Sequence, residues 1–318
     1  MSFTPSRWAR GPHLQTIVPT FSPIGGTDPA AEVHDVEVGS GTSVRTLVTR
    51  APAGSRGTIV LLHGLGGSAK GVYMVRTARA ALARGWSAVR VNLRNCGGTE
   101  HLARTLYNAG QSDDLGRVLE VAGRIGLPRP YAAIGFSLGG NLALRYAGLA
   151  GAGSLADAFV GVNPPVDLIR CIEAIERPAN RAYHLYFRAK LIAQLRAIRR
   201  VRDVPGPAAT WRSIRGVRAF DDLFTAPDAG LPSAEAYYVH ASAGPVLEGI
   251  RRPTLVLSAA DDPFVPVTMF PAWNGASPHV RFVHPDSGGH CGYWSAGIPR
   301  FWAAEAALAF LDSPENRP

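Results

Sequence analysis

The order of apolar and polar positions predicts strands and helices in regular alternation. Two segments alternate apolar and polar side chains around the turn sequence GSGT, at 33–38 and 44–49, and this pattern indicates an antiparallel hairpin. A continuous apolar run at 58–64 is typical of a strand buried on both faces of a parallel sheet. Further strands are expected at 86–94, 131–136 and 158–165. Helical spacing lies between the strands, at 73–85, 112–126 and 138–151, and Ser112 is the expected N-cap of the second helix.

The alternation stops after the strand at 158–165. Residues 166–249 are mostly helical in pattern and contain several scattered prolines. Strand patterns then return at 253–262 and 280–286, and a last helix is expected at 300–312. Because strands that alternate with helices build parallel sheets, we expect a mostly parallel central sheet flanked by helices. The sequence predicts a single α/β domain over 1–318 with an inserted helical cap at 166–249.

The charge of the chain is concentrated in this predicted cap. The whole sequence has a net charge of +9, and residues 166–219 contain 12 Arg and Lys against 4 Asp and Glu, so 12 − 4 = +8. The sequence contains none of the common nucleic-acid-binding motifs, so we expect no nucleic-acid partner. Three distant cysteines form neither a disulfide framework nor a metal knuckle, which favours a reducing compartment. The N-terminus resembles no signal peptide, no apolar run approaches a membrane span, and a cytoplasmic location is expected.

One helical segment of the cap allows two interpretations. Four apolar side chains recur on one helical face, namely Phe187, Leu191, Leu195 and Ile198. In the first interpretation this face packs on the core and the basic face is solvated. In the second, the helix lies at an interface and is attracted to anionic lipid. The oligomeric state does not follow from the sequence.

A serine sits in a glycine-rich turn that is typical of a nucleophile. Residues 135–139 read GFSLG and match G-x-S-x-G, with an expected strand before Ser137 and an expected helix after it. This context presents a serine hydroxyl at the carboxyl edge of the sheet, in front of a helix N-terminus that favours negative charge. The alternative is a tight strand-to-helix turn with a spectator serine.

A serine needs a base, and the base needs an acid. In the chain order Ser, Asp, His, the expected base is His290, which lies in a glycine-rich loop after the last strand. Two adjacent carboxylates follow the preceding strand, Asp261 and Asp262. We favour Asp262 because of its spacing from the following Val-Pro, while Asp261 stays open because side-chain directions in a turn are not set by sequence. The acid would hold the tautomer of His290 and stabilise its imidazolium form.

Two backbone N–H groups would complete an oxyanion hole. Leu138 follows the serine directly, and Leu65 lies in the loop 63–68, which reads HGLGGS. This glycine-rich loop is no phosphate-binding loop, because no Gly-Lys-Ser/Thr follows. His63 precedes the serine in the chain and is assigned a structural role in the loop, and Cys96 and Cys291 are interpreted as packing residues. We expect neither a metal nor an organic cofactor.

With these residues in place, the chain resembles the α/β-hydrolases. It is most similar to the branch that contains bacterial YheT-type hydrolases, plant EMB8-like proteins and the animal ABHD1 and ABHD3 group. The matching segments run nearly end to end: PHLQTI at 12–17, HGLGGS at 63–68, NLRNCGG at 92–98, GFSLGGN at 135–141, FDDLFTAP at 220–227, AADDPFVP at 259–266 and GGHCGYW at 288–294. Asn95 departs from the family, which usually has glycine there. The PHLQTI arm would be a lid over the pocket or pack along the edge of the fold.

The resemblance implies an α/β-hydrolase fold and a serine hydrolase that cleaves carboxylic esters. It also implies short- to medium-chain or lipid esters as substrates. Three alternatives stay open: an acyltransferase with the same triad, a phospholipase acting at a membrane surface, and a non-catalytic lipid-binding protein with a relict site.

Overall fold

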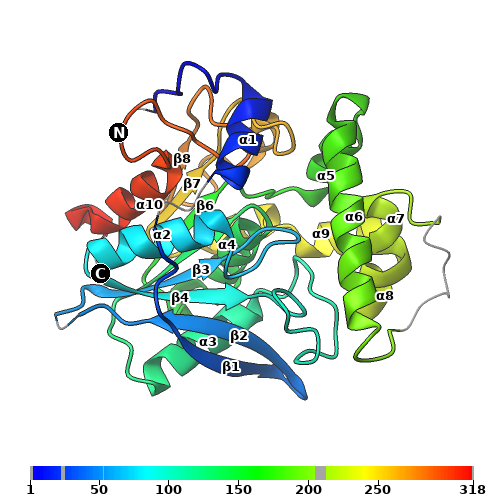
Figure 1. Cartoon of the computed structure of the whole chain (residues 1–318), viewed down its shortest axis with the longest axis horizontal. Helices are drawn as coiled ribbons and strands as arrows, with labels where there is room; N and C mark the ends of the chain where they lie inside the picture. Colours follow the sequence, from blue (N-terminus) through cyan, green and yellow to red (C-terminus); the bar gives the residue numbers. More distant parts are fainter. Residues whose placement is uncertain (1–2, 23–25, 53, 205–212, 317–318) are drawn as a thin grey trace.

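The fold is built on one twisted sheet (Figure 1). A computed structural model of the chain describes residues 3–22, 26–52, 54–204 and 213–316. Within these residues the sheet has eight strands in the order β1-β2-β4-β3-β5-β6-β7-β8. The strands are β1 (Glu32–Gly39), β2 (Thr42–Thr49), β3 (Gly57–Leu62), β4 (Trp86–Asn92), β5 (Tyr131–Phe136), β6 (Ala158–Val162), β7 (Thr254–Leu257) and β8 (Val280–Val283). The predicted mostly parallel sheet is confirmed: the six strands β3 to β8 run parallel, and β1 and β2 form the antiparallel edge.

The burial of each strand explains why the two sequence patterns differ. Every residue of β3, β4, β5 and β6 is buried, because helices cover both faces of the parallel region. In β3, Ile59 and Leu61 join one hydrophobic cluster, and Val60 and Leu62 join the other. The edge strand β1 is largely exposed to solvent, which explains why polar residues alternate with apolar ones along it.

Helices pack on both faces of the sheet (Figure 1). On one face, α2 (Val72–Ala83) packs beside α10 (Trp302–Asp312), and α1 (Pro12–Phe21) contacts α2. On the other face lie α3 (Asp113–Arg124) and α4 (Leu138–Ala150). Ser112 is the N-cap residue of α3, as predicted, but its buried hydroxyl makes no capping hydrogen bond among the described residues.

The segment between β6 and β7 is helical, as its pattern predicts. It contains α5 (Leu168–Glu176), α6 (Arg181–Ile198), α7 (Val217–Phe220), a π-helical turn (Asp221–Thr225), α8 (Ala226–Asp228) and α9 (Ala234–Ala241). These helices stand beyond the carboxyl ends of the strands (Figure 1). Leu191, Leu195 and Ile198 of α6 are buried in the core, and Phe187 is half-buried against it. None of the helices within the described residues is long and apolar enough to cross a membrane.

Candidate active site

Ser137 lies in the sharp turn between β5 and α4. Its backbone has φ 53° and ψ −122°, a region that non-glycine residues rarely adopt. The turn is so tight that a Cβ atom on Gly135 would lie 2.1 Å from the carbonyl oxygen of Gly139. The Ser137 N–H donates to the carbonyl of Val162 at the end of β6. Glycine at position 135 therefore permits the tight turn that places the Ser137 hydroxyl at the carboxyl edge of the sheet.

His290 connects the serine to a buried carboxylate. The Oγ of Ser137 lies 2.9 Å from Nε2 of His290, and Nδ1 of His290 lies 2.8 Å from Oδ2 of Asp262. The Asp262 side chain has no exposed surface. With Nδ1–H donating to Asp262, the Nε2 lone pair faces Ser137 and can accept its hydroxyl proton. This arrangement can raise the nucleophilicity of the serine oxygen.

The carboxylate also sets the charge state of the imidazole. Burial disfavours the protonated ring, but the negative charge and the hydrogen bond of Asp262, together with the neighbouring Cys291, outweigh burial and raise the pKa of His290 well above its ordinary value. An imidazole in this position is stabilised once it has taken a proton. A base that must hold a proton between two steps of a reaction needs this property.

The two adjacent aspartates have different hydrogen-bond partners in the structure. Oδ1 of Asp262 accepts the N–H groups of Phe264 and Val265, at 2.8 and 3.0 Å, and these bonds turn Oδ2 toward His290. Asp261 points elsewhere: its Oδ1 accepts the N–H of Gly289, at 2.8 Å. Asp262 therefore contacts the imidazole, and Asp261 supports the loop that carries it.

Sequence reasoning missed Asn163, which lies beside this pair. Its Nδ2 donates to Oδ2 of Asp262 at 2.6 Å and to the carbonyl of Gly289 at 3.1 Å. Asn163 is fully buried and has φ 47°. The available signal was an asparagine between a buried strand and two prolines, a position that suits a left-handed residue.

Sequence reasoning also missed the role of α1. Thr16 Oγ accepts the N–H of His290, at 2.9 Å, and donates to the carbonyl of Pro12. The fully buried Gln15 accepts the N–H of Trp294 and donates to the carbonyl of Trp294. The arm contacts the histidine loop so closely that a Cβ on Gly292 would overlap the carbonyl of Gln15. Of the two predicted roles for the arm, packing is present, and α1 also lines the pocket described below.

The loop that carries Leu65 touches the serine and is tightly held. A Cβ on Gly64 would lie 3.1 Å from Cβ of Ser137. The N–H groups on either side of Leu65 are already bonded, Gly64 to the Tyr73 hydroxyl at 3.0 Å and Gly66 to the Tyr107 hydroxyl at 3.1 Å. Leu138 is the first residue of α4, where backbone N–H groups have no partner within the helix.

His63 fastens the base of this loop. Its Nδ1 lies 2.8 Å from the carbonyl of Gly64, and its Nε2 accepts the N–H of Leu93. Burial lowers the pKa of His63 to about 4, although its bond to Gly64 acts in the opposite direction. The ring is therefore neutral near pH 7, which fits the predicted structural role.

Asn95 stands where the related family usually has glycine. It has φ 57°, a left-handed conformation that asparagine tolerates better than most residues. Its Nδ2 donates to the carbonyl of Thr105, and its own carbonyl accepts from Gln194 of α6. Asn95 therefore holds this left-handed position with hydrogen bonds to its own loop and to α6.

A mostly apolar pocket opens at Ser137 and His290. It has a volume of about 350 Å³ and lies between α1 and α6. Ile17 and Phe21 line it from α1, Tyr186 and Phe187 from α6, and Phe264 from the loop after β7. A pocket of this size and lining is typical of small-molecule sites with a few polar groups.

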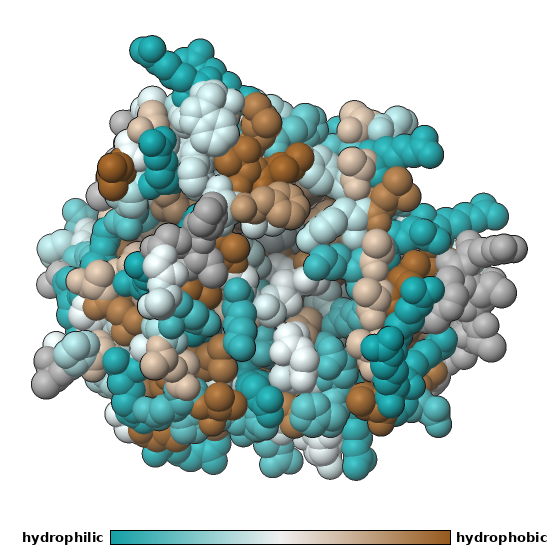
Figure 2. All heavy atoms as spheres, in the orientation of Figure 1, coloured by the Kyte–Doolittle hydropathy of each residue, from teal (hydrophilic) through white to brown (hydrophobic). Residues whose placement is uncertain are grey.

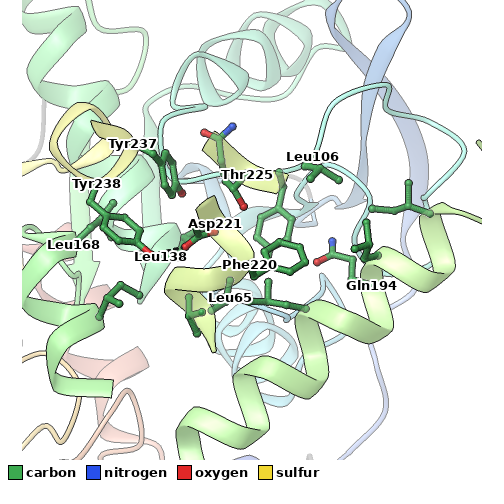
Figure 3. Close-up of a pocket in the computed structure, with 17 residues that line it drawn as sticks. Leu65, Leu106, Leu138, Leu168, Gln194, Phe220, Asp221, Thr225, Tyr237 and Tyr238 are labelled. Atoms are coloured by element: carbon green, nitrogen blue, oxygen red, sulfur yellow. Dashed lines mark hydrogen bonds between the residues drawn. The ribbon is translucent and has the colours of Figure 1, made fainter. Parts of the chain in front are cut away.

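A second, smaller cavity of about 60 Å³ shares Leu65 with this pocket (Figure 3). Leu65 and Leu138 line it together with Asp221 and Tyr238. The Tyr238 hydroxyl donates to Oδ2 of Asp221, at 2.7 Å. Burial raises the pKa of Asp221 to about 6, although hydrogen bonds from Thr225 and Tyr238 counteract this effect.

Comparisons with known proteins identify the family and the fold of the chain. A family model described as the alpha/beta hydrolase fold matches residues 57–296. The putative esterase YheT of Escherichia coli (strain K12) is 32% identical over 307 residues, which cover 94% of this chain and 90% of that protein. The phospholipase ABHD3 of Homo sapiens is 28% identical over 250 residues, which cover 78% of this chain but 61% of that protein. The crystal structure of 2,6-dihydroxy-pseudo-oxynicotine hydrolase superposes with a TM-score of 0.64 at 18% identity, covering 96% of this chain and 73% of that one, and shows likeness of fold alone.

Proposed function

Because the chain belongs to the family of the alpha/beta hydrolase fold, we propose that it is a serine hydrolase that cleaves carboxylic esters. The observation that carries this proposal is the line of contacts from Ser137 through His290 to Asp262, with distances of 2.9 and 2.8 Å. A serine, a histidine and a buried carboxylate in this geometry are the parts needed for nucleophilic acyl transfer.

The reaction proceeds in two halves. Ser137 Oγ attacks the ester carbonyl carbon while its proton passes to Nε2 of His290, and the N–H groups of Leu65 and Leu138 bind the oxyanion that forms. His290 then gives this proton to the alkoxy oxygen, the alcohol leaves, and an acyl-serine results. A water molecule loses its proton to His290, attacks the acyl-serine and releases the acid, and Ser137 recovers its proton. Asp262 keeps the ring oriented throughout.

The pocket supports an acyl ester with an apolar chain as the substrate. Its walls are largely aromatic and aliphatic, so transfer of a hydrocarbon chain from water into it is favourable. The names of the relatives, an esterase and a phospholipase, agree with short- to medium-chain or lipid esters. We also propose that the helices within 166–249 form a cap on a single domain, since α6 contributes one wall of this pocket. The three unpaired cysteines favour a cytoplasmic location.

An active-site probe tests the proposal. The chain is expected to be labelled by a fluorophosphonate, and Ser137→Ala is expected to lose both the label and the hydrolysis of p-nitrophenyl esters. Ser68→Ala, which changes a serine in the neighbouring loop, serves as the matched control and is expected to keep both. Absence of labelling in a folded wild-type chain contradicts the proposal and favours a non-catalytic lipid-binding protein. With an added alcohol acceptor, free acid as the main product supports hydrolysis, and a new ester as the main product identifies an acyltransferase instead.

A further inference from the structure

Exposed apolar side chains surround the mouth of the Ser137 pocket. On α1, Leu14, Ile17 and Phe21 are 45%, 42% and 78% exposed. On α6, Leu185 and Tyr186 are 48% and 47% exposed. Ile17, Phe21 and Tyr186 also line the pocket. We call these five side chains the α1–α6 rim.

The two halves of the rim lie on one face of the molecule. Figure 2 shows apolar atoms gathered over α1 and a smaller group on α6, on either side of a hollow. A direct contact links the helices, because Nδ1 of His13 lies 3.0 Å from the Tyr183 hydroxyl and the two rings stack. Scattered apolar side chains are normal on a protein surface, but a group that borders a pocket is typical of an interaction site.

The segments that carry the rim bear only positive charge. Residues 177–202 include eight Arg and Lys and no Asp or Glu, and residues 3–27 include two Arg and no acidic residue. Arg10, Arg181 and Lys190 are exposed. The ammonium group of Lys190 lies 5.5 Å from the centre of the Tyr186 ring, so a cation and an apolar rim residue lie side by side.

We propose that the α1–α6 rim docks on the surface of an anionic lipid bilayer. The apolar side chains enter the boundary between headgroups and acyl chains, and the surrounding cations contact the negative headgroups. Neither contribution alone gives firm binding, whereas apolar area and cations together do. The inference rests on the proposed function in one respect: docking would place the mouth of the Ser137 pocket against the lipid, from which an ester substrate could enter directly.

Charge complementarity favours a bilayer over a second copy of the chain. Two identical cationic rims repel each other, since each carries basic side chains and no acidic residue in the same segments. An anionic membrane attracts both halves of the rim at once. The attraction falls with ionic strength, because exposed charges are screened over about 8–10 Å at 0.1–0.15 M salt.

Vesicle co-sedimentation tests the docking. The full chain is mixed with phosphatidylcholine vesicles, with and without phosphatidylglycerol, in 0.1 and 0.5 M NaCl. We expect binding to the anionic vesicles at low salt and weaker binding at high salt. Arg10→Ala with Arg181→Ala is expected to weaken binding by about 20- to 30-fold, since each cation near the surface contributes about fivefold. The control pair, Arg117→Ala with Arg124→Ala on α3, lowers the net charge equally and is expected to change binding less than about threefold.

A second set of variants tests the apolar part. Leu14→Ser with Leu185→Ser removes rim side chains that do not line the pocket, and is expected to weaken vesicle binding at least tenfold. Val33→Ser with Leu149→Ser removes side chains that are 57% and 54% exposed elsewhere, and is expected to leave binding unchanged. Equal effects of the rim and control pairs overturn the proposal, as does a wild-type chain that stays in the supernatant with anionic vesicles. Rim-dependent dimerisation without vesicles, seen by sedimentation velocity, also overturns it.

Fluorophosphonate labelling without vesicles separates this proposal from the catalytic one. The Leu14 and Leu185 variants are expected to be labelled like the wild-type chain, because neither side chain lines the pocket. A chain that binds anionic vesicles through the rim but is never labelled would retain the docking surface and lose the proposed hydrolase activity.

Discussion

At the scale of single residues, the direction of one carboxylate decides how the site can work. Asp261 and Asp262 are neighbours with the same side chain, yet only Asp262 contacts His290. Two backbone N–H groups and Asn163 hold Asp262 in this direction. The sequence left the choice open because the selecting groups come from Asn163, which follows β6, and from the turn itself.

Asparagine at each position tests this difference. Asp262→Asn is expected to lower kcat/KM on a water-soluble ester by about 10³- to 10⁴-fold, because the ring loses its orientation and its counter-charge. Asp261→Asn keeps an oxygen that can accept the Gly289 N–H, so a change of less than about tenfold is expected. Steady-state kinetics and thermal melting of both variants measure the effect. Similar losses in the two variants would contradict the assignment.

The acid limb of the pH–rate profile reports on His290. Its ring must be neutral to accept the serine proton, so activity is lost as the pH falls through the pKa of His290. Burial lowers this pKa, but Asp262 together with Cys291 raises it further than burial lowers it. The midpoint of kcat/KM is therefore expected above pH 6.5, the ordinary value. In Asp262→Asn the raising effect of this carboxylate is lost, so the midpoint of the residual activity is expected at a lower pH than in the wild-type chain. A midpoint that is the same in both proteins would show that Asp262 does not govern the ring.

At the scale of elements, the strands were predictable because each carries its own burial pattern. Continuous apolar runs identify β3 to β6, and alternating segments identify β1 and β2. Both patterns are local and do not depend on contacts with distant parts of the chain. The helix α1 is different. It has a proline inside it and mixes polar and apolar side chains, and its buried Gln15 bonds the carbonyl of Ala9 and the backbone of Trp294, which lies 279 positions away. Ser112 occupies the predicted N-cap position, but its backbone is helical rather than extended, and its side chain makes no capping hydrogen bond.

The contact of α1 with the histidine loop can be tested with two threonines of the same helix. Thr16→Val removes the acceptor for the backbone N–H of His290, and kcat is expected to fall about tenfold, the effect of one lost hydrogen bond that positions the histidine. Thr20→Val is the control, since Thr20 also lines the pocket but its hydroxyl bonds only the carbonyl of Thr16 among the described residues. KM is expected to change little in either variant. Thr16→Ser restores the hydroxyl and should recover kcat. If Thr16→Ser does not recover kcat, α1 supports the histidine loop through packing and not through the Thr16 hydroxyl.

At the scale of the whole molecule, the helices beyond the sheet enclose a buried acid. Asp221 lies in the π-helical turn, lines the small cavity beside Leu65 and receives a hydrogen bond from Tyr238. Burial raises its pKa from 3.8 to about 6. The unfolded chain therefore releases this proton at lower pH than the folded chain does. Stability from this group is present below pH 3.8 and is lost as the pH rises through 6.

His63 acts in the opposite direction. Its pKa falls from 6.5 to about 4 on folding, so its contribution is present above pH 6.5 and is lost as the pH falls through 4. The pH ranges in which Asp221 and His63 change the stability overlap. Because the two groups act in opposite directions, their effects on the pH dependence of stability largely cancel in the wild-type chain. Only a variant that removes one group can expose the other.

Asp221→Asn is that variant. Its free energy of unfolding, relative to that of the wild-type chain, is expected to increase by about 2–3 kcal/mol between pH 4 and pH 7, because the wild-type chain alone must bury a carboxylate at the higher pH. Urea denaturation at a series of pH values measures this difference, and groups that titrate equally in both proteins drop out of it. Asp222→Asn removes the adjacent, exposed carboxylate and controls for the loss of one negative charge. A relative stability that stays flat across this range would show that Asp221 is not desolvated beneath the helices.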